Sequence, residues 1–174
     1  MLGSSIRIGL AIILCLAIKT TQIYSQTSET PPDMVAPLII KLAGFEKNLS
    51  GSGKDLSIYV MGSPSMYAVL GNMIGTKIGN STVANVMSGD DLPIIQPAIL
   101  YLGNASRVDD AIKYTRSKQI LSVSGIPDLV NNGITLGIGI GDEGNPSVLL
   151  NMASSKEEKL VWNPAILKIA KTIK

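Results

Sequence analysis

The fold is decided by residues 119–151, which read QILSVSGIPDLVNNGITLGIGIGDEGNPSVLLN. The stretch opens with an apolar run rich in β-branched residues and breaks at Gly125 and Pro127. After a short polar link, two more apolar segments, 134–140 and 148–151, flank the turn-rich sequence GDEGNP. This order of apolar runs and turn residues predicts a buried strand, a short linking element and then an antiparallel hairpin.

Three glycines of this stretch, Gly139, Gly141 and Gly144, match the G-x-G-x-x-G spacing of dinucleotide-binding proteins. Such a site requires the third glycine to open a helix whose N-terminus holds the pyrophosphate. Here Asn145 and Pro146 lead into another strand-like run instead. We therefore interpret the glycines as residues of the hairpin turn.

Helix and strand patterns alternate upstream of this stretch. Apolar residues at spacings of three or four predict a first helix that starts near Pro37 or just before it. A second helix is predicted after Ser63 and Pro64, a capping residue followed by a first-turn proline, and a third from about Val108. Strands are predicted at residues 56–61, 82–86 and 98–102.

A last helix is predicted at the C-terminal end of the chain. Asn163 is a suitable N-cap, and Pro164 suits the first helical position. The apolar face of this helix is expected to comprise Ile166, Ile169, Ala170 and Ile173.

The alternation of continuous apolar strands with helices predicts an α/β fold. We expect a single three-layer domain, with a largely parallel sheet, helices on both faces and a C-terminal antiparallel hairpin. The chain has 174 residues, of which 45% are hydrophobic, enough for one core. The domain is predicted to span residues 35–174, and the polar, proline-containing residues 27–34 are expected to be a flexible linker.

A secretory signal peptide is predicted in residues 1–26. Arg7 precedes an uninterrupted apolar run from Ile8 to Ile18, and Lys19 ends it. This run is shorter than the roughly 20 residues that span a bilayer. It matches the apolar region of a signal peptide, with an uncleaved signal anchor as the alternative. A cleavable signal implies an exported protein.

The charge balance argues against a nucleic-acid partner. All 13 acidic residues lie outside the predicted signal peptide, whereas two of the 15 basic residues, Arg7 and Lys19, lie within it. The mature chain is therefore expected to be neutral, without the basic face that binds nucleic acid.

The residue types of most catalytic and metal sites are absent from the mature sequence. The chain has no histidine, and its only cysteine, Cys15, lies in the predicted signal peptide. Ser-His-Asp and Cys-His nucleophiles and the usual zinc and copper sites are thereby excluded. Adjacent carboxylates such as Glu157 and Glu158 are interpreted as solvated surface, and Trp162, the only tryptophan, as a core residue. We expect no enzyme activity, no metal and no cofactor.

Small and polar residues follow the predicted strands. In a parallel sheet the carboxyl ends of the strands lie at one edge, where α/β proteins bind ligands. Candidate ligand or partner contacts at these strand ends are Gly62, Ser63, Gly103, Asn104, Ser124 and Gly125.

Four short segments carry a resemblance to a known family. They are residues 120–124 (ILSVS), 132–134 (NGI), the hairpin end 148–151 (VLLN) and the C-terminal residues 164–170 (PAILKIA). With the order of elements from about Val35 to Ile173, they resemble the YfiR/HmsC-like family of bacterial periplasmic proteins. The residues that match its motifs are Ser122, Gly133, Asn151 and Leu167.

The resemblance implies a periplasmic regulator that binds the outer-facing sensor part of an inner-membrane diguanylate cyclase. Cyclic di-GMP output, and with it biofilm formation, would fall while the regulator is bound. An outer-membrane lipoprotein and a second copy of the chain are further partners that the resemblance suggests. Redox sensing is not carried over, because the cysteines that some members use are absent. The alternative hypothesis is a periplasmic small-ligand-binding module of an uptake or sensing system.

Overall fold

The computed structural model describes residues 28–141 and 143–173, and these residues are organised around one eight-stranded sheet. The predicted signal peptide, residues 1–26, lies outside the described residues. The strands are β1 (Asp55–Met61), β2 (Lys77–Ile78), β3 (Ser81–Gly89), β4 (Ile99–Leu102), β5 (Leu121–Ser124), β6 (Leu136–Ile140), β7 (Pro146–Asn151) and β8 (Lys171–Ile173). The helices are α1 (Pro32–Ala43), α2 (Lys47–Gly51), α3 (Pro64–Gly71), α4 (Val108–Lys118), α5 (Leu129–Asn132), α6 (Met152–Glu157) and the 3₁₀ helix η1 (Pro164–Lys168).

The sheet is largely parallel. Its order is β2-β3-β1-β4-β5-β6-β7-β8, and the five central strands from β3 to β6 all pair in parallel. Antiparallel pairs occur only near the two edges of the described sheet, between β2 and β3 and between β6 and β7, while β8 pairs in parallel with β7. The predicted sheet type is confirmed.

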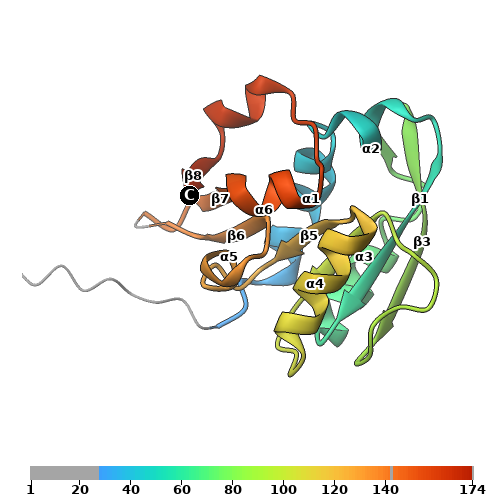
Figure 1. Ribbon diagram of the computed structural model, residues 1–174, viewed down its shortest axis with the longest axis horizontal. Coiled ribbons are helices and arrows are strands. Elements are labelled where there is room, and N and C mark those ends of the chain that lie inside the picture. The colour runs from blue at the N-terminus through green and yellow to red at the C-terminus, as the bar shows by residue number, and fades with distance from the viewer. Residues whose placement is uncertain (1–27, 142, 174) are drawn as a thin grey trace, which may run out of the picture.

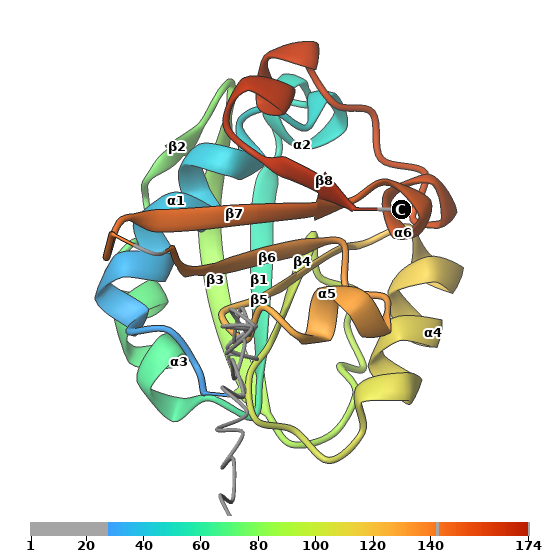
Figure 2. The same cartoon turned by 90° about the vertical axis from the view of Figure 1, so that its left-hand side faces the viewer.

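Helices cover both faces of the sheet, which confirms the three layers. Figure 2 shows α1 and α3 on one side of the strands and α4 and α5 on the other. Each side has its own hydrophobic core, one built with α1 and α3 and the other with α4. Every residue of β4 and β5 is consequently buried. Strands covered on both faces have this uninterrupted apolar character.

The predicted hairpin is confirmed. β6 and β7 pair from Leu136↔Leu150 to Ile140↔Pro146. The turn is closed by the amide of Gly141, which donates to the carbonyl of Asn145 at 2.7 Å. Because the chain continues into β7 and not into a helix, the glycine pattern does not form a dinucleotide-binding turn.

The predicted C-terminal helix is largely wrong. The cap exists, because the Asn163 side chain accepts a hydrogen bond from the amide of Ala165 at 3.0 Å. However, only the short η1 follows, and the chain then forms β8 along the open edge of β7. Ile166 and Ala170 are buried, whereas Ile169 is exposed. Backbone pairing with β7 outweighs the local helical spacing, since tertiary context overrides weak helix propensity.

The predicted linker, residues 27–34, also differs from the structure. Its described part packs against the sheet, and α1 already begins at Pro32. The amide of Thr30 donates to the carbonyl of Gly125 at 2.8 Å, and the hydroxyl of Tyr101 donates to Glu29 Oε1 at 2.5 Å. Proline at the first helical position is Pro32, not Pro37, which lies inside the helix.

We predict that Tyr101→Phe lowers the free energy of unfolding by about 1–2 kcal/mol. The variant removes the hydroxyl that donates to Glu29 and accepts from the buried amide of Gly125. Urea denaturation measures the change. Tyr67→Phe, at a position 41% exposed, should leave the stability unchanged. Equal stability of Tyr101→Phe and the wild type would show that the N-terminal segment is not held in this way.

Candidate functional site

An apolar groove of about 750 Å³ lies where α6, η1 and the end of β7 meet. In Figure 1 this C-terminal part of the chain, in orange and red, runs from β7 through α6 and back to β8. Its volume falls within the range of sites that bind ligands or partner side chains. The apolar lining residues are Leu150, Met152, Leu160, Val161, Trp162, Pro164, Ile166 and Leu167.

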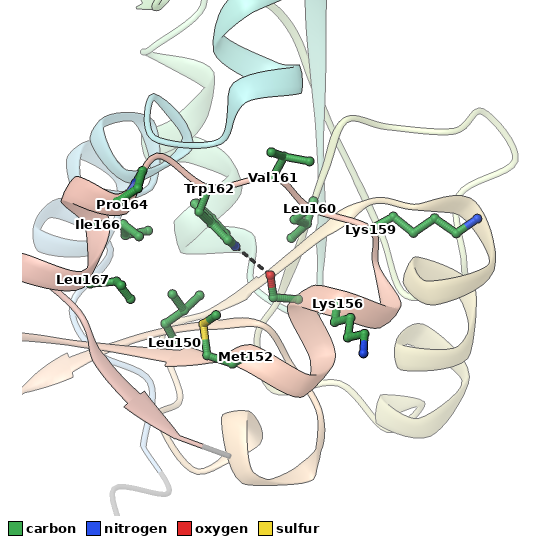
Figure 3. Close-up of a pocket in the computed structure, with 11 residues that line it drawn as sticks. Leu150, Met152, Lys156, Lys159, Leu160, Val161, Trp162, Pro164, Ile166 and Leu167 are labelled. Atoms are coloured by element: carbon green, nitrogen blue, oxygen red, sulfur yellow. Dashed lines mark hydrogen bonds between the residues drawn. The ribbon is translucent and has the colours of Figure 1, made fainter.

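Trp162 forms the centre of the groove and is held in one orientation. Its indole Nε1 donates to Ser155 Oγ at 2.7 Å. Figure 3 shows this hydrogen bond, together with Leu150, Met152 and Leu167, which line the same groove. The groove therefore presents a fixed aromatic side chain, a type enriched among residues that dominate binding energy.

The rim of the groove combines exposed apolar groups with positive charge. Met152, Val161 and Leu167 are 42%, 47% and 53% exposed. Lys156 and Lys159 lie at the end of the groove next to α6 (Figure 3). A contiguous exposed apolar surface of this kind is typical of a binding site.

Two turns with clear local causes build the groove. The Asn151 side chain caps α6 by accepting from the amide of Ser154 at 2.9 Å, and it also donates to the carbonyl of Val130 at 2.9 Å. At the other end of α6, Lys159 has a φ of +54°, so the chain reverses there and brings Trp162 back over Ser155.

Two buried glutamates hold the reversed segment from opposite ends. Glu46 accepts from the amide of Val161 at 2.8 Å through Oε1 and from the amide of Leu49 at 2.7 Å through Oε2. Glu158 Oε2 accepts from the Ser122 amide at 3.1 Å and from the Thr135 hydroxyl at 2.7 Å. The backbone between these two points carries Leu160 and Val161 of the groove.

Glu158 lies in an environment that disfavours its charge. Burial raises the pKa of its carboxyl, and the nearby hydroxyls of Ser122, Thr135 and Thr115 lower it by less. Oε1 has no hydrogen-bond partner. The sequence interpretation of the Glu157/Glu158 pair as surface is thus wrong for Glu158, whereas Glu157 is half exposed and pairs with Arg116 at 2.7 Å.

The motif residues from the family resemblance lie around the groove and its support. Leu167 lines the groove and Asn151 caps α6. Ser122 binds Glu158 through its amide, and its hydroxyl accepts from the amide of Thr135 at 2.8 Å. Gly133 ends α5 with a φ of +121°, and a Cβ there would lie 2.8 Å from the guanidinium of Arg116.

Four of the six strand-end residues meet at the adjacent carboxyl ends of the parallel strands β1 and β4. A Cβ at Gly62 would lie 2.9 Å from the backbone after Gly103, at Asn104 and Ala105, and a Cβ at Gly103 would lie 2.6 Å from that of Ser63. The Ser63 hydroxyl caps α3 by accepting from an amide at 3.3 Å. The ends of the two strands are closely packed. A small cavity of about 240 Å³ lies beside them, and Gly62 and Ser63 are among its lining residues.

The other two strand-end residues lie under the N-terminal segment. The Ser124 hydroxyl donates to the carbonyl of Leu102 at 2.7 Å and accepts from the amide of Ile126 at 2.9 Å. The Gly125 amide donates to the Tyr101 hydroxyl at 3.1 Å. These contacts stabilise the fold, and a role for all six strand-end residues in ligand or partner binding stays a prediction.

The sequence does not reveal the groove. Trp162, predicted as a core residue, packs against the core and also lines the groove, and Met152 and Val161 have no functional signal in the sequence. The faces of α6 are hard to assign because small polar residues, Ser154 and Ser155, occupy its buried side. Among the lining residues, Leu167 is the one that the family resemblance identifies as a motif residue.

The described part of the chain, residues 28–141 and 143–173, holds no helix long and apolar enough to cross a membrane. Within the same ranges, no group of three or more His, Cys, Asp or Glu side chains is placed to hold a metal ion.

We predict that Gly62→Ala destabilises the fold by at least about 2 kcal/mol, because Gly62 has a φ of +71° and backbone 2.9 Å from a Cβ. Gly71→Ala is the control, since Gly71 lies in α3 with open space around it and alanine favours helix. Urea unfolding compares the two. Similar stabilities of the two variants would contradict the close packing of β1 and β4.

We predict that Glu158→Gln stabilises the protein increasingly as pH rises. The raised pKa means that the folded state binds the Glu158 proton more tightly than the unfolded chain. The contribution of Glu158 to the free energy of unfolding is therefore complete below its unfolded-state pKa, and it is lost as pH rises through its folded-state pKa. Glutamine stays neutral and avoids this loss. Melting temperatures across a pH series test this, with Glu157→Gln as the exposed control. Parallel pH profiles for Glu158→Gln and the wild type would refute it.

Comparisons with known proteins agree with this fold. A solved structure, a conserved domain protein from Vibrio cholerae O1 biovar eltor strain N16961, is similar with a TM-score of 0.57 and 13% sequence identity. The match covers 84% of this chain and 61% of that chain, so this chain spans less than two thirds of it. No curated protein matches. The family model described as YfiR/HmsC-like matches residues 33–171, and the chain therefore belongs to the YfiR/HmsC-like family.

Proposed function

We propose that this protein restrains an inner-membrane diguanylate cyclase by direct contact in the periplasm and so lowers cyclic di-GMP signalling. The observation that carries the proposal is the apolar groove around Trp162 in a chain of the YfiR/HmsC-like family. Export by a signal peptide in residues 1–26 is part of the proposal. A contact mechanism needs a binding surface and no catalytic group.

The groove suits a protein segment as its occupant. A partner side chain that packs on Trp162 would bury the exposed apolar parts of Met152 and Leu167, which supports association through the hydrophobic effect. Because Lys156 and Lys159 lie at one end, we propose that the cyclase segment places a carboxylate there. The partner chemistry is thus an apolar anchor with an acidic neighbour.

A small-ligand-binding module is the second candidate function. The cavity of about 240 Å³ at the carboxyl ends of β1 and β3 favours it, because Ser63, Ser88 and Asp90 line part of this cavity. A thermal-shift screen with small polar metabolites tests this candidate. A metabolite that raises the melting temperature of both the wild type and a variant of the Trp162 groove would support this candidate. If no metabolite raises the melting temperature, the candidate is contradicted.

We predict that Leu167→Asp weakens binding to the cyclase sensor domain at least about tenfold. The change places a charge in the groove at a position that is 53% exposed, so the fold should tolerate it. Ile74→Asp is a matched control, since Ile74 is 52% exposed and is not among the groove residues. Calorimetric titration with the periplasmic domain of a cyclase encoded beside this protein measures the affinity.

The same variants can be compared in cells by measuring cyclic di-GMP. Leu167→Asp should raise cyclic di-GMP as deletion of the protein does, and Ile74→Asp should behave as the wild type. If deletion leaves cyclic di-GMP unchanged, or if both variants bind as the wild type does, the proposal fails.

A further inference from the structure

We infer that a single buried proton on Glu158 controls the shape of the groove. The neutral carboxyl holds the end of α6 and the adjoining groove wall in place, and ionisation releases them. This inference concerns the regulation of the groove. It rests on the proposed function only in that the groove is taken to bind a partner, and the titration itself needs no partner.

The contacts of Glu158 fit a neutral acid better than a carboxylate. One oxygen, Oε2, accepts two hydrogen bonds, from the Ser122 amide and the Thr135 hydroxyl. The other, Oε1, is buried without a partner. The Thr115 hydroxyl donates to the carbonyl of Ile112 at 3.0 Å, so its proton is used within α4. A neutral carboxyl avoids the cost of burying a charge beside the unpaired Oε1.

No cation faces the Glu158 carboxyl from the described elements packed around it. β5 contributes Ser122, the residue before β6 is Thr135, and α4 contributes Thr115. The neighbouring Arg116 of α4 pairs instead with Glu157, at the surface. A buried carboxylate without a cation is costly, and ionisation favours movement of the group toward water.

Glu158 is connected to the groove through the backbone of α6. Its amide donates to the carbonyl of Ser154 at 2.9 Å, and two residues later the amide of Leu160 donates to the carbonyl of Ser155 at 3.0 Å. Ser155 also holds the indole of Trp162. Movement of the Glu158 side chain out of the core would therefore displace the turn at Lys159 and loosen Trp162.

The two glutamates that hold the wall differ in this respect. Both oxygens of Glu46 accept hydrogen bonds from backbone amides. Glu158 has one oxygen unpaired. The end of the wall with an unpaired buried carboxyl oxygen is the one at α6, next to Lys156 and Lys159.

Fluorescence of Trp162 tests the inference without a partner, because the chain has a single tryptophan. Emission of the full mature protein is recorded from about pH 5 to about pH 9, a range that covers documented buried glutamates. We expect the wild type to show one sigmoidal shift of the emission maximum while far-UV circular dichroism stays constant. Glu158→Gln should keep the low-pH emission throughout, and Glu157→Gln should titrate as the wild type does.

A flat wild-type profile would overturn the inference, as would a Glu158→Gln profile that follows the wild type. Ser155→Ala checks that the emission reports the groove, since it removes the indole hydrogen bond and should shift the emission at all pH values. Binding of the cyclase domain is measured separately over the same range. Failure to bind at any pH would refute the proposed function and leave the titration of Trp162 as an independent result.

Discussion

Burial of the central strands on both faces is the constraint on which the rest of the structure depends. All residues of β4 and β5 are inaccessible to water, so each polar group among them needs an internal partner. Ser124 meets this need through Leu102 and Ile126, and Ser122 through Thr135 and Glu158. The carboxyl edge, where many α/β proteins bind ligands, is correspondingly filled by closely packed backbone at Gly62 and by the N-terminal segment.

The same constraint explains why the candidate binding surface lies at the side of the sheet. At this edge of the sheet the short α6 and η1 pack beside β7 and β8, while α5 contacts β6 and β7 (Figures 1 and 2). Leu150 is fully buried beneath the groove, whereas Trp162 is only half-buried by the elements around it. The groove is the apolar surface that these elements leave uncovered, and in the proposed function a partner covers it.

The buried Glu158 connects the core of the sheet to α6, which forms part of the groove, through hydrogen bonds. It links β5, the start of β6 and the end of α6 through Ser122 and Thr135, which makes the position of α6 dependent on a polar group inside the core. Buried polar groups of this kind specify one arrangement when all their hydrogen bonds are made. Ser122 and Asn151, which the family resemblance singles out, belong to the same supports.

Signals within a few residues were sufficient to predict the β6–β7 hairpin, the Ser63 cap of α3, the strands β1, β3, β4 and β5 and the α/β class. The tertiary structure alone decided the rest. β8 forms in place of a C-terminal helix because the open edge of β7 is available, 22 residues away at Leu149↔Lys171. Glu158 is buried because it accepts hydrogen bonds from Ser122 and Thr135, which lie 36 and 23 residues away in the chain. Local propensities are weak compared with such long-range pairing and burial, and no short pattern encodes them.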